Sequence, residues 1–188
     1  MTTITTSGNT ATIAGALRRL YFIRFGFAVV WAAVVALTAS AVSPLVAVLL
    51  VLYPVFDLAA AVVDHRATRS TRPAALLYVN MALSLLAAVA LGFAATSGTS
   101  AVLVVWGLWA LTAGAVQLIV GLTRRGLGGQ WPMIISGGIS VLAGFGFILM
   151  SSGSSPSLVG LAGYATLGGI FFLVSAIRLG RTAKAGTR

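Results

Sequence analysis

Asp57 is the residue whose position points most strongly to chemistry. It lies thirteen residues after Pro44 and seven before Asp64, within a long apolar run. A helix rises about 1.5 Å per residue, so Asp57 would lie roughly 10 Å inside the boundary of a membrane-crossing helix. An ionisable group at that depth is costly and is by default a candidate functional residue.

The sequence leaves three interpretations of Asp57 open. The favoured one is a structural ion pair with Arg24, which enters the preceding apolar run from the same side. The second gives the carboxylate a role in proton or cation handling, and the third leaves it water-exposed or snorkelling. A dry core around the pair would favour a structural role, whereas a water-accessible cavity reaching Asp57 would favour transport.

Two amides and one imidazole are the other polar groups of interest. Asn80 and Gln117 interrupt apolar runs, and we expect them to form hydrogen bonds across helices, with a substrate contact as the alternative. His65 is the only histidine, and the chain has no cysteine. A catalytic triad or a His/Cys metal site therefore lacks further residues to draw on. We expect a non-enzymatic protein with no catalytic, metal-binding or cofactor-binding residues.

The polar residues are set in six apolar stretches, each of about 20 residues, which is the length a helix needs to cross a bilayer. Helices are expected because lipid offers backbone groups no hydrogen-bonding partner, and the stretches lack the alternation of a transmembrane barrel. The sequence predicts an all-α membrane protein with six transmembrane helices. The stretches are approximately Leu20–Ala39, Pro44–Val63, Ala74–Ala95, Ala101–Leu122, Trp131–Met150 and Leu158–Ile177.

The charge distribution predicts the topology. Only 7% of the residues are charged, yet the net charge is +10. All twelve Lys and Arg residues flank the apolar stretches on one side, which the positive-inside rule assigns to the cytoplasm, together with both termini. The basic charge is thus explained without nucleic acid. We expect the lipid bilayer itself as the partner, with anionic headgroups at the cytoplasmic Arg and Lys residues.

The chain also repeats. We expect a disordered cytoplasmic tail over residues 1–17, a transmembrane domain over 18–181, and a basic tail over 182–188. Within the domain, three tandem helical hairpins are predicted, at about 18–70, 71–126 and 127–181. Small residues recur at every fourth position on the first, third and fifth predicted helices: Ala28, Ala32, Ala36; Ser84, Ala88, Gly92; and Ser140, Gly144.

Small residues at this spacing let helices approach closely. Further close contacts are predicted at Ala110–Gly114, Ser136–Ser140–Gly144 and Gly168–Gly169. Scaffold packing is the expected role of all these residues. Lining a pore, or forming a homo-oligomer, stays open as the alternative.

The repeat resembles the HdeD family of short-repeat bacterial membrane proteins. The resemblance rests on Ser43–Pro44 and Ser155–Pro156 at the outer turns and on the stretches Trp106–Gly114 and Gly163–Gly169. It covers about Arg18 to Arg181 and implies a bacterial inner-membrane protein associated with acid resistance. The family supplies no agreed catalytic residues to carry over.

The first repeat departs from this pattern, because Asp57 stands where the later repeats have Gly114 and Gly169. The leading expectation is a non-enzymatic inner-membrane protein of the HdeD type that contributes to acid or envelope stress tolerance. The alternative is a small transporter or channel that passes protons or a solute and uses Asp57 as its coupling carboxylate.

Overall fold

Six long helices account for almost all of the computed structural model, which describes residues 4–68, 75–123 and 131–185. No strand occurs in these ranges. Each helix contains a segment long and apolar enough to cross a membrane, which confirms the predicted fold class. The helices are α1 (Ile4–Thr38), α2 (Pro44–Thr68), α3 (Ala75–Ser97), α4 (Thr99–Thr123), α5 (Trp131–Ser151) and α6 (Val159–Ala185).

The helices extend further at the chain ends than the sequence predicted. α1 is helical from Ile4, so the prediction of a disordered tail over residues 1–17 was wrong for most of that segment. Likewise, α6 continues to Ala185, through most of the predicted tail at 182–188. Both segments lack proline, and adding a residue to an existing helix is far easier than starting one. The apolar parts begin at Gly15 in α1 and end at Arg181 in α6.

The three uncharged connections contain residues that favour helix starts and tight turns. The Ser43 hydroxyl accepts the backbone N–H of Val46 at 3.3 Å, which caps α2 just before Pro44. Only Gly98 separates α3 from α4, and its φ of +101° is a conformation that glycine adopts without strain. This turn is shorter than the predicted connection at 96–100. The α5–α6 connection, residues 152–158, is the longest of the three.

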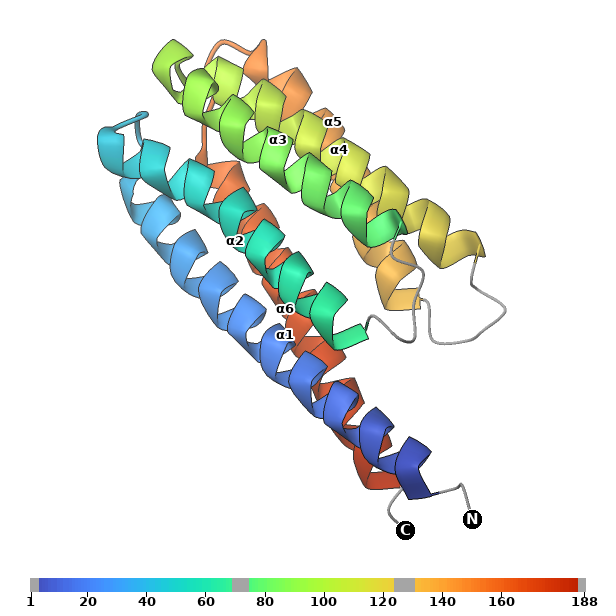
Figure 1. Cartoon of the computed structure of the whole chain (residues 1–188). Helices are drawn as coiled ribbons and strands as arrows, with labels where there is room; N and C mark the ends of the chain where they lie inside the picture. The colour runs from blue at the N-terminus through green and yellow to red at the C-terminus, as the bar shows by residue number, and fades with distance from the viewer. Residues whose placement is uncertain (1–3, 69–74, 124–130, 186–188) are drawn as a thin grey trace.

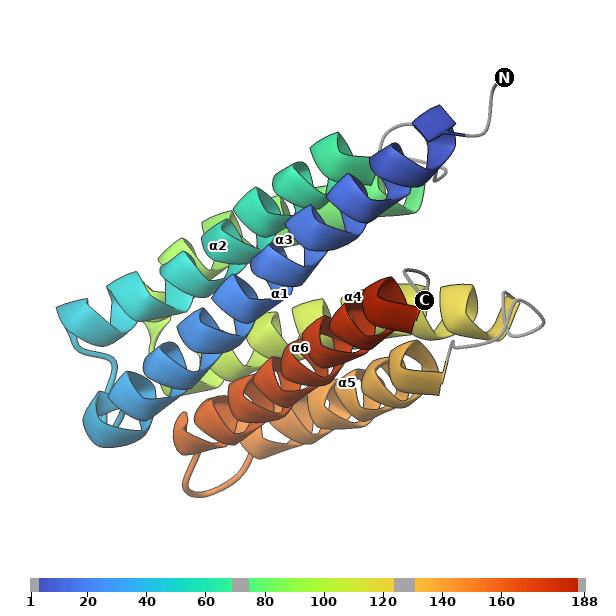
Figure 2. The same cartoon turned by 90° about the horizontal axis from the view of Figure 1, so that it is seen from below.

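The six helices form a closed ring in chain order, with α6 packed against α1 (Figures 1 and 2). The most extensive packing is α4 on α5, then α1 on α6 and α2 on α3, so each of these close pairs joins two different predicted hairpins. Hairpin partners α5 and α6 pack together least among neighbours. The predicted superposition of the three hairpins stays a prediction.

α1 begins and α6 ends at one end of the bundle, where α2 and α4 finish and α3 and α5 begin (Figure 1). We call this the basic end, and the half of the bundle away from it the far half. Six basic side chains are described there: Arg18, Arg19, Arg24, Arg66, Arg178 and Arg181. The other basic side chains, Arg69, Arg72, Arg124, Arg125, Lys184 and Arg188, lie outside the described side chains. The helix directions agree with the predicted alternation, and the cytoplasmic assignment stays a prediction.

Glycine brings α4 and α5 into backbone contact. A Cβ on Gly144 would lie 2.6 Å from the Gly107 carbonyl oxygen, and one on Gly137 would lie 2.7 Å from the Leu118 nitrogen. A Cβ on Gly114 would lie 2.6 Å from the Cβ of Ser140. Real side chains do not come this close, so only glycine fits. The predicted close approaches at Gly114 and Gly144 are confirmed.

The predicted contact at Gly168–Gly169 is confirmed at one of its two residues. A Cβ on Gly169 would lie 3.2 Å from the Ala28 Cβ, which places α6 close to α1. A Cβ on Gly168 would meet only the Tyr53 hydroxyl, at 3.9 Å. Gly168 is one residue earlier on the helix, so it points away from the contact with α1.

The far half is packed with apolar side chains. Those at the centre are completely buried, and dispersion contacts rather than a hydrophobic drive hold such helices together in lipid. This half therefore closes the bundle opposite the basic end. The buried cluster includes Val35, Val46, Leu50, Leu91, Val102, Leu103, Leu158 and Leu161.

Candidate functional site: a polar cavity at the basic end

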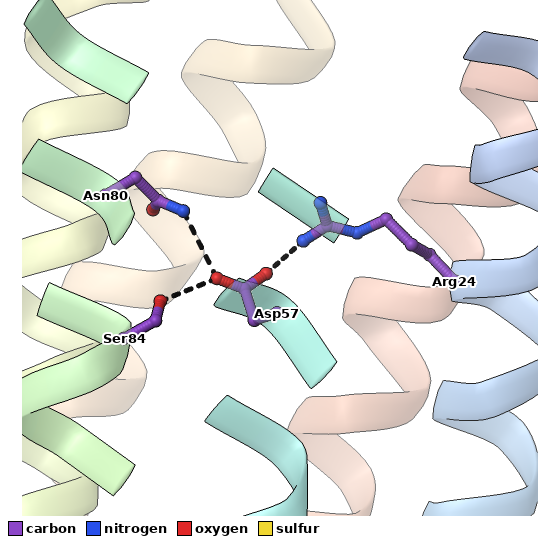
Figure 3. Close-up of polar contacts among 4 residues, drawn as sticks. All are labelled: Arg24, Asp57, Asn80 and Ser84. Carbon is purple, nitrogen blue, oxygen red and sulfur yellow. Dashed lines mark hydrogen bonds and ion pairs between the residues drawn. The ribbon is translucent and has the colours of Figure 1, made fainter. Parts of the chain in front are cut away.

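Asp57 lies at the centre of a polar network that joins three helices (Figure 3). The Arg24 guanidinium of α1 donates from Nη2 to Asp57 Oδ1 and forms an ion pair with it. From α3, Ser84 Oγ donates to Asp57 Oδ2 at 2.7 Å and Asn80 Nδ2 donates to the same oxygen at 3.2 Å. The predicted Asp57–Arg24 contact is confirmed, and so is a cross-helix hydrogen bond from Asn80.

Helix geometry explains why α3 supplies two donors. Asn80 and Ser84 are four residues apart, so they lie on one face, a turn apart. That face packs against α2, which brings both donors to Asp57. The sequence analysis had assigned Ser84 only to a ladder of small residues. Its spacing from Asn80 was the available signal for a polar role.

Arg24 is also held from a second side. Its guanidinium carbon lies 4.1 Å from the ring centroid of Phe172 in α6, a cation–π geometry. The side chains of Arg24 and Asp57 are only 14% and 15% exposed. At such burial each charge depends on the other, because removing one would leave its partner desolvated and unpaired. The network thus links α1, α2, α3 and α6.

The network forms part of the wall of a cavity of about 680 Å³. All six helices contribute to this cavity, mostly with residues towards the basic end, while Tyr164 and Leu167 of α6 line it nearer the α5–α6 connection. Asp57 is therefore paired with Arg24 and also lines a cavity. The sequence analysis had treated the ion pair in a dry core and the cavity reaching Asp57 as alternatives. Besides tyrosines, the polar lining residues are Arg24, Asp57, Asp64, His65, Asn80, Gln117, Ser136, Ser140, Ser175 and Arg178.

Gln117 lines the same cavity on the opposite wall. Its Nε2 donates to the Met133 backbone carbonyl at 3.3 Å, so the predicted cross-helix bond is confirmed between α4 and α5. His65 Nε2 lies 3.2 Å from the Tyr78 hydroxyl, an exposed contact near the basic end. The structure thus unites three of the four candidate residues and places Gln117 on another wall.

Aromatic rings close the cavity towards the far half. Tyr53 lies 4.7 Å from Trp31 and 5.5 Å from Trp106 between ring centroids, and those two indoles stack at 5.4 Å. Trp109, which also lines the cavity, meets Trp106 edge-on at 5.4 Å. Trp31 and Trp106 are 2% and 0% exposed. We call these four residues the aromatic floor, and the sequence analysis did not predict that they would meet.

The acidic side chains and the histidine are few among the described residues. Among them, no three His, Cys, Asp or Glu residues gather where they could hold a metal ion. The network pairs a carboxylate with a guanidinium at the edge of a cavity.

Comparisons with protein-family models, curated proteins and solved structures find no match for this chain. The resemblance to the HdeD family therefore rests on its sequence motifs alone. The architecture stands independently of it, because six apolar helices identify an integral, multi-pass membrane protein.

Proposed function

We propose that this protein is a small-solute transporter of the bacterial inner membrane, with its binding cavity open towards the basic end. The observation that carries the proposal is the cavity lined by all six helices, which reaches Asp57 and ends at the aromatic floor. Transporters bind their substrates near the middle of the membrane, between helices that rearrange around the site. A cavity at one end and a packed half at the other fit one state of such a cycle.

Asp57 would couple this cycle to a proton or a cation. Its oxygens already accept hydrogen bonds from Arg24, Ser84 and Asn80. A proton or cation on the carboxylate would cancel the charge that Arg24 pairs with. Arg24 would then be buried against Phe172 without its counter-ion, which would favour a different packing of the helices.

A non-enzymatic structural role in acid or envelope stress, as the HdeD resemblance implies, is the competing proposal. The low exposure of the Asp57–Arg24 pair supports it, because such a pair also serves as a tie between helices. In either case the exposed arginines at the basic end would attract anionic lipid headgroups. Self-association through small residues is compatible with both proposals.

Site-directed labelling tests the transport proposal directly, because the chain has no cysteine and each introduced thiol is unique. Ser136→Cys and Ser175→Cys place a thiol on the cavity lining, whereas Val102→Cys and Leu161→Cys place one in the fully buried far half. In proteoliposomes, a membrane-impermeant maleimide should label the cavity positions from one side only.

A pH gradient should then make the far-half thiols reactive from the other side if the bundle alternates between two states. Asp57→Asn should abolish that response. Far-half thiols that stay unreactive under every gradient and solute tried would rule out transport and leave the structural proposal. Unreactive cavity thiols would show that no solute enters at all.

A further inference from the structure

The α5–α6 seam differs from the others in where its contacts lie. The contacts described there are the Tyr164 hydroxyl donating to Ser140 at 3.0 Å, the Phe147–Tyr164 ring pair at 5.8 Å, and Gly160 against Phe147. All of them lie between the α5–α6 connection and Ser140. Among neighbouring helices, α5 and α6 pack together least.

The cavity is bordered by residues of both α5 and α6. Ser136 and Ile139 of α5 and Leu167 of α6 line it, and Leu167 is also 45% exposed on the outside of the bundle. Leu167 lies in the middle of a membrane-crossing segment, where the surroundings are lipid rather than water. One side chain thus borders both the cavity and the hydrocarbon.

The chemistry along the cavity changes with depth. Trp109 and Tyr164 lie deep, whereas Arg178 lines it near the basic end. Exposed guanidinium groups surround that end, and a concentration of one charge sign attracts ligands of the other. Those exposed groups belong to Arg18, Arg19, Arg66, Arg178 and Arg181.

We propose that the cavity opens sideways into the membrane between α5 and α6 and takes up a single-chain anionic amphiphile. The anionic head would lie towards the basic end, and the chain would lie between Leu167 and the aromatic floor. A volume of about 680 Å³ falls within the roughly 300–1,000 Å³ of pockets that hold drug-sized ligands. That size suits one acyl chain better than a two-chain phospholipid. This inference rests on the proposed function, because it names the class of solute.

Tryptophan quenching tests the inference. Trp131 is 71% exposed and would report bulk lipid, so Trp131→Phe is the background, leaving Trp31, Trp106 and Trp109. In lipid nanodiscs, a terminally brominated undecanoate should quench these indoles saturably. A brominated two-chain phosphatidylcholine and a brominated undecanol should quench far less.

A matched pair of variants locates the route. Ser136→Phe fills the cavity side of α5, and we expect it to weaken undecanoate binding by about tenfold or more. Gly138→Phe lies two residues away, where a Cβ would meet nothing within 4 Å, so it should leave binding unchanged. If Ser136→Phe fails to fold, Ser136→Cys can instead be blocked after folding with a bulky maleimide.

Equal quenching by phosphatidylcholine or undecanol would overturn the selection for an anionic single chain. Equal effects of the two phenylalanine variants would overturn the α5–α6 route. If undecanoate fails to quench while Ser136→Cys is labelled from the aqueous side, the lateral inference falls and the solute cavity remains. If both signals are absent, the inference and the proposed function fall together.

Discussion

The two sides of α5 are held in opposite ways. On one side, Gly137 and Gly144 press against the α4 backbone so closely that no side chain fits between. On another face, Ser136 and Ile139 line a cavity, and the Tyr164 hydroxyl of α6 donates to Ser140. The α4–α5 seam is thus closely packed along its backbone, whereas the α5–α6 seam is the least packed between neighbouring helices. The contrast shows that one helix can be scaffold on one face and site on the other.

The largest effect should come from breaking the tight seam. Gly144→Val places a side chain within 2.6–2.8 Å of Gly107 and Leu111. Two of these contacts are with backbone atoms of α4, so the clash is relieved only if the two helices move apart. We expect a loss of about 3 kcal/mol in the free energy of unfolding, measured by denaturation in mixed micelles. Gly146→Val is the control, because a Cβ at Gly146 meets nothing within 4 Å. Equal stability of the two variants would show that the seam is not close-packed.

The next largest effect should come from breaking the Asp57–Arg24 ion pair, which lies in the cavity wall rather than in the close-packed α4–α5 contact. Asp57→Asn and Arg24→Gln should each cost roughly 2 kcal/mol of stability, since each leaves a charge largely buried and unpaired. The double variant should lose less than the sum of the two. A double-mutant cycle by thermal unfolding measures this coupling. Strictly additive losses would mean that the two side chains do not interact.

A smaller effect should follow from removing one donor to Asp57. Ser84→Ala removes the 2.7 Å hydrogen bond to Oδ2, while Asn80 and Arg24 still contact the carboxylate. We expect a loss of about 1 kcal/mol in the same unfolding assay. Ala88→Ser is a useful comparison, because it adds a hydroxyl one turn away on the same helix. A loss from Ser84→Ala as large as that from Asp57→Asn would make Ser84 the main support of the network.

The smallest effect should appear at the loose seam itself. Tyr164→Phe removes the hydrogen bond to Ser140 and keeps the ring contact with Phe147. Hydrogen bonds between membrane helices contribute about 0.6 kcal/mol on average, so the free energy of unfolding should hardly change. Exchange of α5 and α6 amide hydrogens is a more sensitive readout, and we expect it to rise near Ser140. Unchanged exchange would show that the bond does not hold the seam.

The sequence by itself determined the features that depend only on the residues within a single helix and on the order of the helices. Apolar length predicted the six spans, and the clustering of basic residues at one end followed from their positions. The depth of Asp57 and Arg24 in adjoining spans also followed from helix rise, which is why their pairing could be predicted. Gly114 and Gly144 were identified as contact points because small residues permit close approach wherever they occur.

Only the tertiary structure decided which helix faces meet. Contacts between different helices account for the pairing of α4 with α5, the closure of α6 on α1 and the approach of Ser84 to Asp57. They also bring Tyr53 together with Trp31, Trp106 and Trp109. In lipid the outward faces are as apolar as the inward ones. Hydrophobic periodicity therefore does not indicate which face of a helix packs against its neighbours. The rotation of each helix, and with it the cavity, is fixed by backbone packing at glycine and by a few buried polar contacts.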